Sequence, residues 1–178
     1  MRKLVHAEIV TRQKILNAEP RLPFSILLDN IRSLYNVGAV FRIADGSGVE
    51  KVWLCGITGY PPDSQINKTA LGSEQSVAWE HRKSVIDTVK ELKSNGYQII
   101  LLEQCADSIS YFDFKLKPPV CLVVGNEIGG VSEDLAALAD AAVDIKMAGI
   151  KNSLNASVAC GVVVFHFREQ LMRSQKRV

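Results

Sequence analysis

Five short apolar runs, each followed by a turn or by a segment with helical spacing, constrain the fold of this chain most. The runs occupy residues 24–28, 51–55, 98–102, 120–124 and 142–145. Because apolar residues follow one another almost without interruption instead of alternating with polar ones, the runs are typical of strands buried on both faces. Strands of this kind that alternate with helices predict an α/β protein with a mostly parallel sheet and helices on both faces.

The spacing of apolar residues also predicts where the helices lie. We expect helices over about 37–47, 83–94, 132–139 and 154–172, and a loosely helical segment at 1–18. Gly48 and Gly96 are placed to end the first two, because glycine readily adopts the left-handed conformation of a helix C-cap. Residues 56–79 read as a long irregular loop, and loops of this length are usually functional or mobile. We expect this loop to contact the substrate.

The length and composition are those of one globular domain. The chain has 178 residues, of which 47% are apolar, and this fraction excludes a disordered chain. We expect a single domain over 1–178, with an N-terminal helical extension at 1–22, a core at 24–167 and a basic C-terminal tail at 168–178.

The cysteines and the length of the apolar segments indicate the cellular compartment. The four cysteines are widely spaced, at Cys55, Cys105, Cys121 and Cys160. They form no Cys-x-x-Cys and the three histidines do not cluster, so we expect reduced, buried thiols and no metal site. The longest apolar run, 158–165, is far shorter than the ~20 residues that a membrane span needs. We therefore expect a cytoplasmic protein without a membrane partner.

Basic residues concentrate at the two ends of the chain. Residues 1–21 hold five Lys or Arg and two Glu. Residues 166–178 hold four Lys or Arg and one Glu. The segment between them has 12 basic and 16 acidic residues. Basic ends suit a polyanion such as RNA, because neutralised phosphates supply most non-specific affinity for nucleic acids. Ordinary solvated ends would have the same composition, so charge alone leaves the question open.

Polar residues gather at three junctions where a predicted strand passes into a predicted helix. The junctions span 29–42, 120–132 and 145–159. A helix N-cap explains one polar residue at such a place, and Asn152 or Ser153 would serve at the third junction. Three junctions with unusual polar content are harder to explain as caps alone. All three lie at the carboxyl ends of strands, where ligands of parallel sheets bind.

In this order, the three junctions resemble the motifs of the SPOUT methyltransferase superfamily, in its TrmH (SpoU) branch of RNA 2′-O-ribose methyltransferases. The motifs are Asn-x5-Arg, Gly-x-Glu-x-x-Gly and Ser-Leu-Asn, and each alone is weak. The matching residues are Asn36, Arg42, Gly125, Glu127, Gly130, Ser153, Leu154 and Asn155. The resemblance covers about 24–167, nearly the whole chain. It implies a SPOUT fold with an α/β trefoil knot in the C-terminal part, which no periodicity or spacing indicates.

The resemblance also implies the cofactor, the partners and the site. The cofactor is S-adenosyl-L-methionine, the substrate is RNA, and the family is typically homodimeric. The catalytic residues would be Arg42, Asn36, Glu127, Ser153 and Asn155. The cofactor would be held largely through the backbone of Leu102, Gly125, Ile145, Met147, Ser153 and Leu154. The family often has proline before the methionine, where this chain has Lys146.

Physical chemistry favours one of two catalytic roles for Arg42. The family proposal makes this arginine the acceptor of the 2′-hydroxyl proton. A guanidinium has no available lone pair and a pKa above ~12, so we favour binding of an adjacent phosphate and stabilisation of the developing alkoxide. The structural alternative for Arg42 is an ion pair with Asp45 or Asp29.

Other functions remain open at this stage. An RNA-binding protein of this fold without activity, or a base-methylating SPOUT enzyme, would have a similar sequence. A nucleotide or dinucleotide enzyme is disfavoured because neither Gly-x-Gly-x-x-Gly nor Gly-Lys-Ser/Thr occurs. We favour tRNA over rRNA because the chain has no separate RNA-binding domain. The final helix is apolar on nearly every side as far as Phe167, which favours a homodimer.

Overall fold

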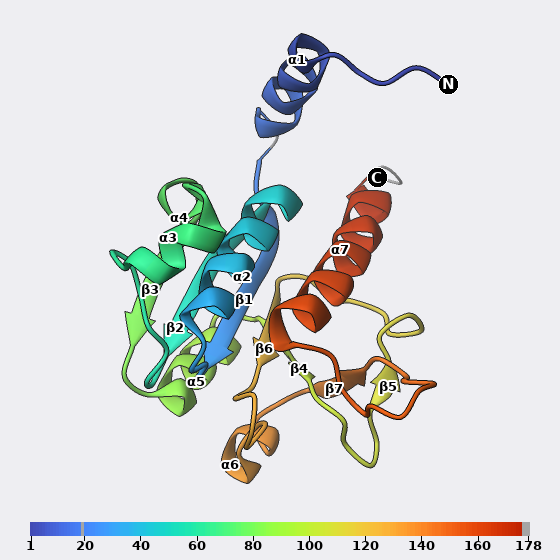
Figure 1. Cartoon of the computed structure of the whole chain (residues 1–178). Coiled ribbons are helices and arrows are strands. Elements are labelled where there is room, and N and C mark those ends of the chain that lie inside the picture. Colours follow the sequence, from blue (N-terminus) through green and yellow to red (C-terminus); the bar gives the residue numbers. More distant parts are fainter. Residues whose placement is uncertain (19, 176–178) are drawn as a thin grey trace.

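One parallel sheet organises the molecule. The computed structural model describes residues 1–18 and 20–175 (Figure 1). Its strands are β1 (Leu22–Asp29), β2 (Val49–Cys55), β3 (Ala78–Arg82), β4 (Gln98–Leu102), β5 (Ile109–Ser110), β6 (Val120–Val124) and β7 (Ala141–Asp144). In this part of the chain they form a seven-stranded sheet in the order β3-β2-β1-β6-β4-β7-β5, and all neighbouring strands are parallel. The predicted α/β class with a mostly parallel sheet is confirmed.

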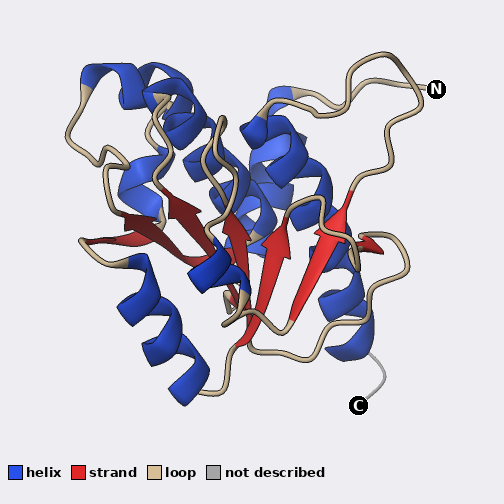
Figure 2. Cartoon of the chain, turned by 90° about the horizontal axis from the view of Figure 1, so that it is seen from below, coloured by secondary structure: helices blue, strands red, loops and turns tan. Residues whose placement is uncertain are grey.

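Helices cover both faces of the sheet (Figure 2). They are α1 (His6–Asn17), α2 (Leu34–Ser47), α3 (Ser64–Ala70), α4 (Ser73–Ser76), α5 (Val85–Ser94), α6 (Glu133–Ala136) and α7 (Ala156–Gln175). α2 and α7 contact each other and pack on one face, while α5 and α6 pack on the other. α1 stands away from the sheet (Figure 1).

The two-sided cover explains the uninterrupted apolar runs. In β1, Ile26 and Leu28 belong to the core cluster under α2 and α7, and Leu27 belongs to the cluster under α5 and α6. Under α7, the rings of Phe24 and Phe167 lie 6.1 Å apart. Each large apolar side chain buried in this way contributes roughly 1.5–3 kcal/mol.

The central strands and one helix end follow the sequence predictions closely. β4 and β6 have the predicted bounds, and Gly48 ends α2 in the left-handed conformation, with φ 75°. α2 begins at Leu34 instead of residue 37, because the Ser33 hydroxyl accepts the backbone N–H of Asn36 and caps the helix earlier. The helix predicted at 83–94 is α5, whose C-cap is Asn95 instead of Gly96.

The prediction of an irregular loop over 56–79 is wrong. This stretch contains α3 and α4, and β3 begins at its end. α3 is capped by Asp63, whose Oδ1 accepts the backbone N–H groups of Gln65 and Ile66. These helices are too short to show a helical period in the sequence, and β3 is an edge strand whose residues are partly exposed.

Two further differences concern short elements beyond β4. The predicted helix at 132–139 is shorter, because after α6 the chain tightens, with Leu138 and Ala139 each bonding to a carbonyl three residues back. The loop before β6 contains the two-residue strand β5, which pairs with β7.

The structure assigns helices to most of the two predicted terminal segments. The extension at 1–22 contains α1, and the start of β1. Residues 168–175 of the predicted tail continue α7, while residues 176–178 and residue 19 lie outside the described part of the chain. No helix among the described residues is long and apolar enough to cross a bilayer. The prediction of buried thiols is confirmed for Cys55, Cys121 and Cys160, whereas Cys105 is partly exposed; all four are free cysteines in the structure.

Candidate functional site

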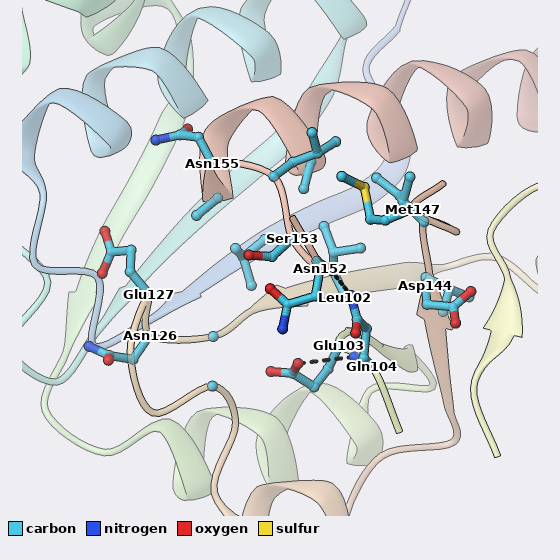
Figure 3. A pocket seen from close by; sticks show the side chains of 18 of the residues that line it. Leu102, Glu103, Gln104, Asn126, Glu127, Asp144, Met147, Asn152, Ser153 and Asn155 are labelled. Atoms are coloured by element: carbon cyan, nitrogen blue, oxygen red, sulfur yellow. Dashed lines mark hydrogen bonds between the residues drawn. The ribbon is translucent and has the colours of Figure 1, made fainter. Parts of the chain in front are cut away.

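A cavity of about 570 Å³ opens where β4, β6 and β7 end (Figure 3). Its volume lies in the range of pockets that hold small organic ligands. The loops after these strands and the segment before α7 form its walls. All six residues assigned to cofactor binding line it, namely Leu102, Gly125, Ile145, Met147, Ser153 and Leu154. Glu127 and Asn155 line it as well.

Hydrogen bonds join the three sequence motifs at one end of this cavity. The side-chain amide nitrogen (Nδ2) of Asn36 donates to Glu127 Oε1 at 2.9 Å. The side-chain Nδ2 of Asn155 donates to Asn36 Oδ1 at 3.0 Å. Asn36 is buried, with 8% of its surface exposed, so its amide is held by these two partners. We refer to Asn36, Glu127 and Asn155 as the amide network.

The amide network also fixes the start of α7. Asn155 Oδ1 accepts the backbone N–H of Ser157 at 3.0 Å and of Val158 at 3.3 Å, so Asn155 is the residue that caps this helix. The predicted caps, Asn152 and Ser153, make no such bonds in the structure. The hydroxyl of Ser157 donates to Asn155 Oδ1 at 2.7 Å and lies 3.4 Å from Asn36 Oδ1.

Glu127 acts as an anionic acceptor in this arrangement. Besides the Asn36 amide, it accepts the backbone N–H groups of Arg32 at 3.1 Å and Ser33 at 3.3 Å, at the start of α2. Partial burial raises the pKa of Glu127, but these hydrogen bonds outweigh it and the net pKa is lowered. A carboxylate in this state holds donors in place and does not supply a proton at neutral pH.

Steric constraints explain why the second motif has glycine at positions 125 and 130. A Cβ on Gly125 would lie 2.8 Å from the carbonyl carbon of Gly130, and Gly130 has φ 61°. The backbone N–H of Gly130 donates to the carbonyl of Asn126 at 2.9 Å and closes the turn. Only glycine lets the two ends of this turn approach so closely, and as a result bare backbone lines the cavity at Gly125.

The charged side chains in the cavity wall are all acidic. The lining side chains include the carboxylates of Glu103, Glu127 and Asp144, and no Lys or Arg lies among the described residues that line it. Coulomb attraction therefore favours a cationic ligand and opposes a polyphosphate. This arrangement does not fit the nucleotide or dinucleotide alternative.

Arg42 lies apart from the cavity. Its exposed side chain lines a second hollow, of about 610 Å³, between α2, α3 and α7, together with Lys68, Ser157 and Val158. Within the single chain, therefore, the amide network and Ser153 meet at the cavity and Arg42 does not. Ser157 is the link between the two places, since it lines the hollow and bonds to Asn155.

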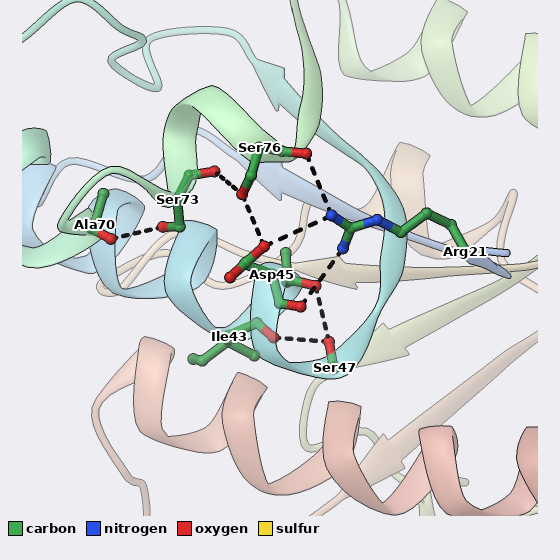
Figure 4. Close-up of polar contacts among 8 residues, drawn as sticks. Arg21, Ile43, Asp45, Ser47, Ala70, Ser73 and Ser76 are labelled. Carbon is green, nitrogen blue, oxygen red and sulfur yellow. Dashed lines mark hydrogen bonds and ion pairs between the residues drawn. The ribbon is translucent and has the colours of Figure 1, made fainter. Parts of the chain in front are cut away.

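The structural alternative for Arg42 does not hold. Asp45 pairs with Arg21, 3.6 Å from its guanidinium, and accepts the hydroxyl of Ser76 at 2.7 Å (Figure 4). Asp29 accepts the side-chain amide of Asn30. Among the described residues, Arg42 has neither an ion-pair nor a hydrogen-bond partner, so its guanidinium is available to an anionic ligand.

Sequence reasoning missed two residues of this region. Ser157 follows the Ser-Leu-Asn motif by two positions, and its serine hydroxyl gave no separate signal. Glu103 follows β4 directly and lines the cavity. A charged residue at the carboxyl end of a buried parallel strand is a signal that could have identified it.

Comparisons with known proteins agree with this geometry. The tRNA (guanosine(18)-2′-O)-methyltransferase of Aquifex aeolicus is 30% identical over 146 residues, which are 82% of this chain and 68% of that protein. The crystal structure of the A. aeolicus TrmH/SpoU tRNA modifying enzyme superposes with a TM-score of 0.82 at 26% identity, covering 97% of this chain and 87% of that one.

A structure with its cofactor also matches. The SpoU methyltransferase AviRb from Streptomyces viridochromogenes, in complex with AdoMet, has a TM-score of 0.76 at 27% identity, over 89% of this chain and 65% of that one. The sequence model of the SpoU rRNA Methylase family matches residues 23–165, which include all three motifs. This chain therefore belongs to the SpoU rRNA Methylase family.

Proposed function

We propose that this protein is an S-adenosylmethionine-dependent RNA methyltransferase that methylates a ribose 2′-hydroxyl, with tRNA as its substrate. The amide network is the observation that carries the proposal, because it joins three motifs from distant parts of the chain at one end of an acidic cavity. The tRNA (guanosine(18)-2′-O)-methyltransferase of A. aeolicus supports tRNA as the substrate class.

The cavity suits S-adenosylmethionine in size, charge and lining. When bound, this cofactor supplies a methyl group on a cationic sulfonium. The carboxylates of the cavity wall attract this positive charge. The apolar side chains of Ile145, Met147 and Leu154 suit an adenine ring, and the bare backbone at Gly125 allows close approach.

The residues of this chain would position the acceptor ribose and stabilise its developing charge. Asn155 and Ser153 lie at the cavity wall, where they can orient a ribose hydroxyl, and Asn36 and Glu127 hold Asn155 in place. Arg42 would bind the RNA phosphate next to that ribose and stabilise the alkoxide as the proton leaves. Lys68, which lines the same hollow, adds positive charge there.

A homodimer is part of the proposal. α7 exposes Val158 (52%), Val162 (38%) and Phe165 (46%) along the hollow that Arg42 lines. Three apolar side chains in a row on one helix face suit a second copy of the same face, since symmetric dimers use one patch twice. Arg42 would then lie at the edge of the dimer contact, within reach of the partner's cavity.

Three further features complete the proposal. The C-terminal part of the core at 24–167 forms the trefoil knot of the family, the basic ends at 1–21 and 166–178 contact RNA, and the protein works in the cytoplasm. The strand order, which places β6 between β1 and β4, supports the family topology. Pulling the chain from both ends in a force spectrometer checks the knot, because a knotted chain extends to less than its full contour length.

A methylation assay tests the function. The purified protein is incubated with unmodified tRNA or rRNA and methyl-tritiated S-adenosylmethionine, and the RNA is digested to nucleosides for mass spectrometry. We expect 2′-O-methylated nucleosides from tRNA. A methylated base would indicate the base-methylating alternative, and RNA binding without incorporation would indicate the inactive one.

A further inference from the structure

Glu103 lines the cavity, and apart from its share in the negative charge of the wall no role described above uses it. Its Oε1 accepts the backbone N–H of Gln104 at 3.0 Å. Its Oε2 accepts no hydrogen bond, and the carboxylate pairs with no basic side chain in residues 1–18 and 20–175. One oxygen of this carboxylate is therefore available to a donor on a bound ligand.

The position of this carboxylate is fixed by its surroundings. A Cβ on Gly130 would lie 2.5 Å from Glu103 Oε2, so the carboxylate packs directly on the bare backbone of the turn after β6. The side-chain amide of the next residue, Gln104, donates to the carbonyl of Asn152 at 2.5 Å and ties this segment to the loop before α7. Glu103 therefore stands at a defined point between three walls of the cavity.

Its place along the cavity indicates which part of the ligand it meets. In Figure 3, Glu127 and Asn155 lie on one side of the pocket and Met147 lies on the other, while Glu103 lies in the lower part of the view, below Asn152 and across from neither side alone. In S-adenosylmethionine the ribose connects the adenine to the sulfonium. If the adenine lay near Met147 and the methyl group faced Asn155, as in the proposed function, the ribose would occupy the middle of the cavity.

We propose that Glu103 binds the cofactor by accepting a hydrogen bond from the 2′-hydroxyl of its ribose. This assignment rests on the proposed function. A carboxylate accepts hydrogen bonds only, and a ribose offers two adjacent hydroxyl donors, so the two groups are complementary. Such a bond would hold the ribose at one place along the cavity, and Glu103 would thereby help to position the methyl group toward the amide network.

Binding calorimetry with two ligands tests the assignment without turnover. The ligands are S-adenosylhomocysteine, which lacks the sulfonium charge, and its analogue with a 2′-deoxyribose. Each is titrated into the wild-type protein, Glu103→Gln, and the control Asp107→Asn, which removes an exposed carboxylate outside the cavity. Circular dichroism checks that each variant is folded.

We expect Glu103→Gln to raise the Kd of S-adenosylhomocysteine about ten- to a hundredfold, which is the usual effect of losing a hydrogen bond to a charged group. The deoxy analogue should bind wild type and Glu103→Gln within about twofold of each other, and Asp107→Asn should bind both ligands like wild type. Equal weakening of both ligands would assign Glu103 to another part of the cofactor and overturn the proposal, as would no weakening of either. If wild type bound neither ligand, the proposed function itself would fail, and this assignment with it.

Discussion

The bond between Asn36 and Asn155 makes a quantitative prediction about stability. Asn36→Ala removes a hydrogen bond to the charged Glu127 and one from Asn155, at 2.9 and 3.0 Å. A bond to a charged group contributes about 1.5–3 kcal/mol and a neutral one about 0.5–1.5 kcal/mol. Because Glu127 is exposed to water, we take the low end and expect a loss of about 2 kcal/mol. For a domain of this size that lowers Tm by roughly 4–8 °C.

Asn155→Ala should cost a similar amount for a partly different reason. It removes the shared bond to Asn36 and also the cap of α7, and loss of such a cap costs about 1 kcal/mol. The double variant loses the shared bond only once. Its destabilisation should therefore be smaller than the sum of the two single ones by about 0.5–1 kcal/mol.

Urea unfolding of wild type, both single variants and the double variant, at one fixed protein concentration, measures this coupling. Asn67→Ala, an exposed asparagine on α3, is the control and should change stability by less than about 0.5 kcal/mol. Additivity of the two single variants within about 0.3 kcal/mol would refute the amide network as we describe it.

Three further predictions follow from the site. Arg42→Ala should lower methyl transfer to tRNA at least about 100-fold while the Kd of S-adenosylmethionine stays unchanged, and near-normal turnover would remove Arg42 from the mechanism. The pKa of Glu127 is lowered in the folded state, because its hydrogen bonds outweigh the effect of partial burial, so its ionised form stabilises the fold. The stability advantage of wild type over Glu127→Gln should therefore be constant near neutral pH and should shrink in urea titrations as the pH falls far enough to protonate this carboxylate. Val162→Arg should convert the proposed dimer to monomers in sedimentation experiments, whereas a wild type that sediments as a monomer contradicts the proposed contact.

The part of the fold that could be predicted from the sequence is the part that is buried. β4 and β6 are central strands with apolar residues toward both layers of helices, and their predicted bounds are correct. β3 and β5 are edge strands, where one neighbour is missing and polar residues are tolerated, so no apolar run marks them. The one-turn helix α4 is held by tertiary contacts that a local pattern does not contain.

The sequence places the candidate site residues near the carboxyl ends of the strands, but it predicts their arrangement only partly. Asn36 is separated from Glu127 by 91 positions and from Asn155 by 119, so no local pattern determines that their side chains bond. The separate location of Arg42 could have been derived from α2 alone. Six residues at about 100° each place Arg42 roughly 240° around the helix from Asn36. The two residues of the Asn-x5-Arg motif therefore cannot face the same side of α2.

This separation gives the first turn of α7 a double role. On one side, Asn155 closes the end of the cavity, and on the other, Val158 forms part of the wall of the hollow where Arg42 lies. Ser157 belongs to both sides through its bond to Asn155 and its place in the hollow. A ligand or a second subunit that packs into the hollow presses on the same helical turn that orients the amide network. Because one helical turn contributes to both places, we expect a substitution in it to affect the amide network and the wall of the hollow together.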